Sequence, residues 1–164
     1  MSRGLEAVFA QKMGTDGFNY LVLHAGIPWE GVDFFRAIHG YALQLGFPYP
    51  VSRTQGLLLA NVPALQTLWA FFEAKFAPQR EDRVASLEQV REIADARLRE
   101  ISNQAEDLAF RTFYNIIDSI LRTNFYRQDR QFHYISFKID CASVNNMPSP
   151  RRRHIIHTGT INLE

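Results

Sequence analysis

The chain has 164 residues, of which 46% are hydrophobic and 13% aromatic, and its net charge is +1. This near-neutral charge excludes a global electrostatic attraction to nucleic acid or to a membrane surface. The charge is uneven, however. Residues 1–107 carry 10 Lys and Arg against 13 Asp and Glu, whereas residues 108–164 carry 8 against 4. Such asymmetry indicates that the two parts have different surroundings or partners.

Cysteine usage and hydropathy indicate the compartment. Cys141 is the single cysteine, so no disulfide can form within the chain, and a reducing cytosol is its natural environment. No apolar stretch of the signal-peptide type follows Met1. The longest apolar runs, such as residues 57–60, are far shorter than the ~20 residues of a membrane helix. We therefore predict a cytoplasmic protein without a signal peptide or membrane span.

The first half of the chain has the start and stop signals of successive helices. Asp16, Ser52 and Asn61 stand where a side-chain oxygen can cap the helix that follows. Gly26 and Gly46 stand where a helix can end in a left-handed residue. Between these signals the apolar residues recur at helical spacing. We predict helices over residues 5–12, 18–25, 29–45, 53–60 and 61–76.

Two longer helices of different character are expected next. Residues 80–101 have a narrow apolar stripe on a highly charged helix, which is typical of packing against one partner helix. Asn103 stands three residues before Glu106, a spacing that predicts the N-cap of the second helix. The second helix has a wide apolar face over residues 108–121, which predicts burial in a core or an interface.

We expect this second helix to continue to about Tyr126, so that Arg122, Thr123 and Asn124 lie in its last turn. A cation offsets the negative end of the helix dipole, and asparagine is common at helix C-termini. This structural role is the simpler interpretation. In a complete enzyme, the same three residues could instead support a substrate cleft or a subunit contact.

The C-terminal residues change to a β pattern. Residues 132–141 and 153–161 are predicted strands, with a proline-containing loop between them. In the first strand, Lys138 alternates away from the predicted core face, where we expect it to be solvated or ion-paired. That core face consists of His133, Ile135, Phe137 and Ile139.

The predicted fold is therefore mainly α. A helical array is followed by a short C-terminal β-hairpin, or by the first two strands of an incomplete α/β domain. We expect the wide face of residues 108–121 and the strand at residues 132–141 to be covered by sequence outside this chain. The isolated chain should then expose apolar surface and tend to associate.

Several strings occur in a characteristic order along nearly the whole chain. They are residues 18–26 with Trp29, residues 44–47, residues 68–76 with Pro78, Glu106 with Asp107, residues 121–126, residues 136–140, and the loop containing Pro148 and Pro150. In this order they resemble the large NAD-specific glutamate dehydrogenases of bacteria.

This resemblance implies a place in a larger parent enzyme. Residues 1–79 would be a segment of a helical bundle, residues 80–127 two connecting helices, and residues 128–164 the first strands of an incomplete catalytic domain. The parent would be an oligomer, with homo-oligomerisation expected, that converts L-glutamate to 2-oxoglutarate and ammonia with NAD. The rest of the dehydrogenase chain would be the partner of this segment. The sequence leaves open whether Glu164 is a natural end.

No constellation of catalytic or metal-ligating residues stands out. The nine glycines never adopt the Gly-x-Gly-x-x-Gly spacing that holds a pyrophosphate, so we predict no NAD site within the chain. The histidines lack partners at metal-ligand spacing. Cys141 has no neighbouring cation and is expected to be a buried or half-buried, inert thiol. The cluster at residues 151–153 is interpreted as a solvated charge run.

We therefore assign no catalytic, cofactor-binding or metal-binding residue to this chain, and we expect it to be inactive by itself. Nucleic-acid binding by residues 52–76 is disfavoured, because the second helix of that pair has Lys75 as its single basic residue. The alternative from another class is a free-standing helical interaction or regulatory module without catalysis.

Overall fold

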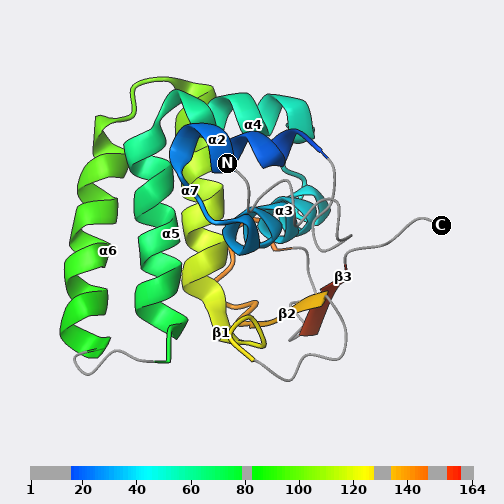
Figure 1. Ribbon diagram of the computed structural model, residues 1–164, viewed down its shortest axis with the longest axis vertical. Coiled ribbons are helices and arrows are strands. Elements are labelled where there is room, and N and C mark those ends of the chain that lie inside the picture. The colour runs from blue at the N-terminus through cyan, green and yellow to red at the C-terminus, as the bar shows by residue number, and fades with distance from the viewer. Residues whose placement is uncertain (1–15, 79–82, 128–133, 148–154, 160–164) are drawn as a thin grey trace.

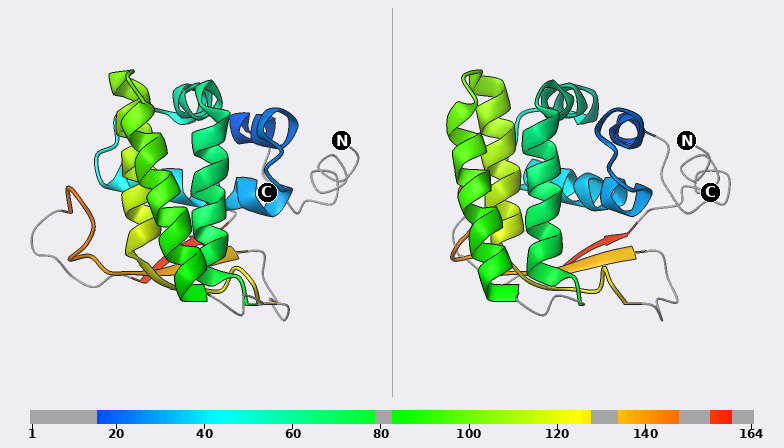
Figure 2. Two further views of the ribbon diagram at one scale, coloured as in Figure 1. Left: turned by 90° about the vertical axis from the view of Figure 1, so that its left-hand side faces the viewer. Right: turned by 60° about the vertical axis from the view of Figure 1, so that its left-hand side comes forward.

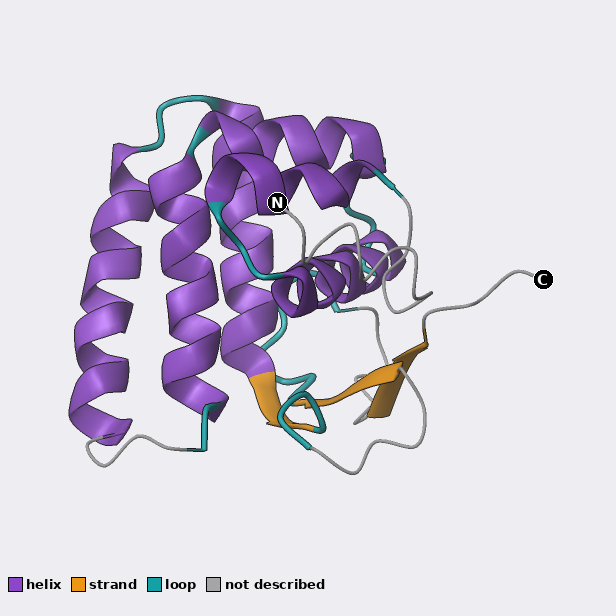
Figure 3. Cartoon of the chain, in the orientation of Figure 1, coloured by secondary structure: helices purple, strands orange, loops and turns teal. Residues whose placement is uncertain are grey.

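In the computed structural model, the residues whose structure is described are 16–78, 83–127, 134–147 and 155–159. They form a helical array followed by a small antiparallel sheet, so the predicted mainly α fold is confirmed (Figure 1; Figure 3). The helical elements are η1 (Gly17–Asn19), α2 (Tyr20–Ala25), α3 (Trp29–Gln44), α4 (Val51–Ala60), α5 (Val62–Phe76), α6 (Arg83–Glu100) and α7 (Gln104–Ser119). The strands are β1 (Ile120–Thr123), β2 (Tyr134–Ile139) and β3 (Ile155–Gly159).

Three predicted helix starts are capped as expected. The Asp16 carboxylate accepts a hydrogen bond from the Phe18 amide, at 2.9 Å. The Asn61 side chain accepts from the amide of Ala64, at 3.2 Å. Asn103 accepts from two amides at the start of α7, those of Ala105 and Glu106. Each bond satisfies backbone donors that have no partner inside the helix.

The cap predicted at Ser52 is wrong. Helix α4 begins one residue earlier, at Val51, and Pro50 occupies the N-cap position with extended backbone. Pro50 fixes its own φ near the value needed there, so the chain enters the helix before Ser52 is reached. Gly26 and Gly46 adopt left-handed conformations, with φ of +66° and +86°, as the helix stops require. The helix predicted over residues 5–12 lies outside the described residues.

Helix α7 lies at the centre of the array. Its apolar face is buried under α3, α4 and α5. The expectation that sequence outside the chain covers this face is therefore wrong, because elements earlier in the chain already bury it. The inner face of β2 is also buried within the chain, where Ile135, Phe137 and Ile139 are 7%, 1% and 1% exposed, whereas Tyr134 and Lys138 on its other face are exposed. The fully buried residues of α7 are Ala109, Phe110, Phe113, Ile116 and Ile117.

The predicted end of the second long helix is also wrong. Helix α7 stops at Ser119, and Ile120 already has extended backbone, with φ of −69° and ψ of +124°. The amide of Asp140 donates to the Ser119 carbonyl at 2.9 Å, and Ile120 pairs with Ile139. Pairing with a strand some twenty residues away thus overrides the local helical pattern.

The three strands form one antiparallel sheet in the order β1-β2-β3. The register shifts between Ile120 and Arg122, which places a bulge at the start of β1. The predicted strand over residues 132–141 is found as Tyr134–Ile139, and the one over residues 153–161 as Ile155–Gly159. The prediction had no counterpart of β1. Figure 2 shows the helices gathered on one side of the sheet, and no helix that the structure describes lies on its other side.

Helix α6 forms an outer layer against α5 (Figure 1). Its apolar stripe is only partly buried. Ala94 and Leu98 are 2% and 5% exposed, whereas Val84 is 74% exposed. Packing against one partner helix, as predicted from the narrow stripe, is confirmed.

One hydrophobic core unites helices and sheet. It runs from Phe18 to Val144 and includes residues of η1, of each described helix and of β1 and β2. The division into residues 1–79, 80–127 and 128–164 stays a prediction about the parent enzyme, and the described parts of these ranges share this core.

Candidate functional site

Four phenylalanines lie at the contact between helices and sheet, and we call them the aromatic junction: Phe34, Phe72, Phe125 and Phe137. The Phe34 ring lies 4.0 Å from that of Phe72, 6.3 Å from that of Phe125 and 5.9 Å from that of Phe137, between ring centroids. The contacts to Phe125 and Phe137 are edge-to-face, a favoured geometry worth about 0.5–1.5 kcal/mol per pair beyond burial. The junction therefore ties α3 and α5 to β2 and to the turn after β1.

The turn after β1 is held by Thr123 and Asn124. The Thr123 hydroxyl accepts a hydrogen bond from the Phe125 amide, at 3.1 Å. The Asn124 side chain donates to the Tyr134 carbonyl at 3.1 Å and accepts from the Ser136 amide at 2.8 Å. The Asn124 carboxamide thus makes the hydrogen bonds to β2 that a further backbone residue of β1 would make. The sequence pattern drew attention to Thr123 and Asn124 but predicted them at the end of a helix. In the structure they lie at the end of a strand and in the turn that follows it.

Arg122 and Lys138 lie on the side of the sheet away from the described helices. They are direct partners in the register of β1 and β2, and both side chains are exposed. The prediction that Lys138 points away from the core is confirmed. The prediction that Arg122 offsets a helix dipole is wrong, because Arg122 lies within β1.

Lys75 takes the role that had been expected of Arg122. Its ammonium group donates to the carbonyls of Ile117, at 3.3 Å, and of Asp118, at the C-terminal end of α7. Burial lowers the pKa of Lys75. The carboxylate of Asp118 lies 3.8 Å away and also receives two hydrogen bonds from Arg91 of α6. We call Lys75, Arg91 and Asp118 the α7 ion cluster, and it links α5, α6 and α7.

Sequence reasoning missed this cluster because Asp118 is 43 residues from Lys75 and 27 residues from Arg91. A lysine near the end of a helix does not indicate which other helix it will reach. The one available signal was the isolation of Lys75 among aromatic residues. That isolation was interpreted only as evidence against nucleic-acid binding.

A second charged group lies at the start of α3. Arg36 donates to Asp16 through two nitrogens, at 2.7 and 2.9 Å, and it also pairs with Asp33. Burial raises the pKa of Asp33 to about 6, against the opposing effect of Arg36. Because Asp16 also caps η1, this group fastens the first described turn to α3. The sequence analysis identified only the cap.

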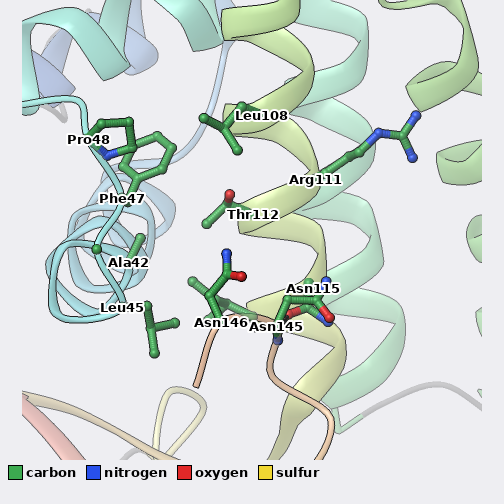
Figure 4. Close-up of a pocket in the computed structure, with 12 residues that line it drawn as sticks. Ala42, Leu45, Phe47, Pro48, Leu108, Arg111, Thr112, Asn115, Asn145 and Asn146 are labelled. Carbon is green, nitrogen blue, oxygen red and sulfur yellow. Dashed lines mark hydrogen bonds between the residues drawn. The ribbon is translucent and has the colours of Figure 1, made fainter. Parts of the chain in front are cut away.

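A pocket of about 340 Å³ lies between the Gly46–Pro48 connector, α7 and the turn at Asn145 and Asn146 (Figure 4). Several of the polar side chains that line it form hydrogen bonds to other groups of the protein. Asn115 donates to the Ser143 carbonyl at 2.9 Å and accepts from the Asn145 amide at 2.8 Å. Figure 4 shows Arg111 pointing away from Asn146, and its guanidinium bonds Asp107. The pocket gathers no set of acids and bases that could act on a substrate.

The remaining candidates have structural surroundings. His39 is 2% exposed, and its Nε2 lies 2.9 Å from the Tyr49 carbonyl oxygen, so it is a bonded core residue. Cys141 is buried, as predicted. Within the described residues, no group of three or more His, Cys, Asp or Glu side chains could hold a metal ion. The cluster at residues 151–153 lies outside the described residues.

No single helix among the described residues is long and apolar enough to cross a membrane. Helices α4 and α5 would reach that length only in combination, and they are bent by 101° at the break between them.

Two family models match the chain. The one described as "Glutamate dehydrogenase, helical motif 3" matches residues 13–78, and the one described as "Bacterial NAD-glutamate dehydrogenase, catalytic domain" matches residues 93–164. The first match ends after α5, and the second begins within α6. The aromatic junction and the α7 ion cluster therefore both contain residues from each match.

Curated relatives agree with these matches. The chain is 28% identical to the NAD-specific glutamate dehydrogenase of Mycobacterium tuberculosis over 165 residues, which cover 94% of this chain and 10% of that protein. It is 32% identical to the protein of the same name from Pseudomonas aeruginosa over 146 residues, 83% of this chain and 9% of that protein. The chain thus spans about a tenth of the length of these relatives.

Proposed function

Because this chain belongs to the family of large bacterial NAD-specific glutamate dehydrogenases, with its third helical motif and part of its catalytic domain, we propose that the whole protein oxidises L-glutamate to 2-oxoglutarate. In this reaction NAD accepts a hydride from the substrate, and water replaces the amino group, which leaves as ammonia. The whole protein would act in the cytoplasm as a homo-oligomer.

The role of this chain in the reaction is to brace the catalytic domain. One observation carries this proposal: the aromatic junction crosses between the two family matches. Phe34 and Phe72 belong to the helical match, while Phe125 and Phe137 belong to the catalytic-domain match. Lys75 also joins the two matches, because its ammonium group in the helical match donates to the Ile117 carbonyl in the catalytic-domain match. The helical motif thus sets the position of β1 and β2.

The chain itself does not catalyse the reaction. Hydride transfer needs a nicotinamide held against the substrate, and the sequence contains no Gly-x-Gly-x-x-Gly segment to bind its pyrophosphate. Mixing the purified chain with glutamate and NAD should therefore produce no NADH absorbance above that of buffer. The Mycobacterium tuberculosis relative is the positive control. NADH formation by the chain would overturn this part of the proposal.

The bracing role is tested by hydrogen exchange. Phe34→Ala removes the ring at the centre of the junction, and we expect the amides of β2, such as that of Ser136, to lose at least tenfold of their protection. Leu23→Ala on α2 is the control, because Leu23 is 56% exposed. Should β2 keep its protection while α3 exchanges faster, the helical motif would not brace the sheet.

A further inference from the structure

Helix α6 is attached to its neighbours unequally along its length. Its second half, residues 94–100, buries Ala94 and Leu98, which are 2% and 5% exposed. The Leu98 carbonyl also accepts a hydrogen bond from Arg111 of α7, at 3.3 Å. In the first half, residues 84–93, no side chain is fully buried, and the apolar contact with the core is made by partly buried residues such as Val90. The first half therefore gains less from apolar burial than the second.

Arg91 supplies the polar attachment of this first half. Its guanidinium donates to both carboxylate oxygens of Asp118, at 2.7 and 3.2 Å, and lies 5.4 Å from the ring centroid of Phe71. Phe71 in turn stacks on Tyr114, with 5.0 Å between the ring centroids. A forked arginine–carboxylate pair is among the stronger polar contacts, and a cation over an aromatic ring adds to it. Among the described residues, no other side chain of residues 84–93 forms an ion pair.

The two partners of Arg91 belong to different regions of the chain. Phe71 of α5 lies in the helical match, and Asp118 of α7 lies in the catalytic-domain match. Arg91 itself lies in residues 79–92, which neither match covers. One side chain therefore contacts both regions from a segment that belongs to neither. These contacts lie on the inner side of α6 and join described residues of this chain to one another.

We propose that residues 84–93 of α6 detach from α5 and α7 and reattach as one unit, while residues 94–100 and the other helices stay folded, with Arg91 as the latch. Segments that bury little apolar surface open at a lower free energy than the core does, and they open cooperatively. This inference goes beyond the proposed function and does not depend on it.

The two forms differ in what they connect. In the closed form, Arg91 joins the helical region to the end of α7. In the open form, the Asp118 carboxylate loses its contact with α6, and the ring of Phe71 loses the cation that covers it. A ligand or partner that binds only one of the two forms would shift the balance between them. The first half of α6 is thus a conformational device between the two matched regions.

Native-state hydrogen exchange of the full chain measures the opening. In the wild-type chain, the amides of residues 88–93 should share one opening free energy and one dependence on urea, and they should exchange at least about tenfold faster than the amides of residues 98–100. Simple fraying of a helix end would instead give protection that rises residue by residue. Such a gradient from residue 88 to 93 would overturn the proposal, as would equal protection of the two halves.

Arg91→Met tests the latch, because it removes the charge and keeps an unbranched apolar side chain. We expect the amides of residues 88–93 to exchange about tenfold faster than in the wild-type chain, and those of residues 98–100 and of α7 to stay within about twofold. Added salt should reduce the difference between the two proteins, because it screens the ion pair of the wild-type chain.

Arg99→Met is the matched control. Arg99 lies on the same helix, is exposed and forms no ion pair within the described part of the chain, so the same loss of charge should leave exchange of residues 88–93 unchanged. Asp118→Asn removes the other partner of the pair. Combined with Arg91→Met, it should accelerate these amides no more than Arg91→Met does alone. Equal acceleration by Arg91→Met and Arg99→Met, or independent effects of Arg91→Met and Asp118→Asn, would overturn the role of Arg91 as the latch.

Discussion

Helices α6 and α7 follow each other in the chain and have similar lengths, 18 and 16 residues, yet one is the outer layer of the molecule and the other its centre. Helix α6 buries Ala94 and Leu98, whereas α7 buries large residues such as Phe110, Phe113 and Ile116 completely. The width of the apolar face decides the difference, because a narrow stripe can be covered by one neighbour and a wide face needs several.

The largest effect on stability is expected for a substitution in α7, at the centre of the molecule. Phe113→Ala should lower the free energy of unfolding by about 3–5 kcal/mol, because it leaves a cavity between α7, Phe35 and Phe47. Urea unfolding measures this loss. Ile93→Ala on α6 is the control, since Ile93 is 45% exposed, and its cost should stay below about 1 kcal/mol. Equal costs at the two sites would contradict the distinction between centre and outer layer.

The link between the two helices gives the next effect. Asp118→Asn removes the carboxylate that pairs with Lys75 and Arg91, and the side chain of Asp118 is 33% exposed. We expect a loss of about 1–2 kcal/mol in the free energy of unfolding, smaller at high salt.

The control for this change is Glu100→Gln on α6. Glu100 pairs with Arg97 near the helix end, where both side chains are exposed. Glu100→Gln should lower the free energy of unfolding by less than about 0.5 kcal/mol. A result in which Glu100→Gln costs as much as Asp118→Asn would show that the α7 ion cluster adds no more than an ordinary surface pair.

A comparable effect, visible as a pH dependence, is expected at the start of α3. Burial raises the pKa of Asp33 from 3.8 to about 6, so the folded protein binds this proton more tightly than the unfolded chain does. Asp33 therefore stabilises the fold below about pH 4 relative to neutral pH, and this contribution is lost as the pH rises through 6. Asp33→Asn cannot ionise. Compared with the wild-type chain, it should gain about 1–2 kcal/mol in relative stability between pH 4 and pH 7.

Unfolding by urea at several pH values tests this prediction. Glu100→Gln again serves as the control, because it also removes one carboxylate. The free energies of unfolding of Asp33→Asn and Glu100→Gln, each relative to the wild-type chain, are compared across these pH values. If both change with pH in the same way, burial of Asp33 is not the cause of the pH dependence.

The smallest effect is expected for Tyr41. Its side chain is 4% exposed, and its hydroxyl has no hydrogen-bond partner within the part of the chain that the structure describes. Burial raises the pKa of Tyr41 to about 12. Tyr41→Phe removes a polar group without a partner, so stability should stay the same or rise by up to about 1 kcal/mol. A loss of more than 1 kcal/mol in thermal or urea unfolding would indicate a partner for the hydroxyl.

Local signals were predictable from the sequence where a few neighbouring residues decide the outcome. The caps at Asp16, Asn61 and Asn103 were correct, because an N-cap depends on a side chain and on amides two or three positions away. The alternation along β2, with Lys138 outside, was also correct, since it depends only on the period of a strand.

The errors occurred where distant residues compete with local ones. A helix to Tyr126 satisfied the local pattern, but pairing of Ile120 with Ile139 ends α7 at Ser119. The role assigned to Arg122 at the helix end belongs to Lys75, which arrives from α5. No periodicity within α7 contains information about either contact.

Except at the end of α7, the sequence by itself determined which of the described segments are helical, how most of them begin and which face of β2 is apolar, because these properties depend on residues within a turn or two. Only the tertiary structure decided that α7 lies beneath α3, α4 and α5, that a third strand precedes the predicted two, and that four phenylalanines join helices to sheet. These features depend on the free energy of burying apolar surfaces that are far apart in the chain, and such burial can override local preference by several kcal/mol.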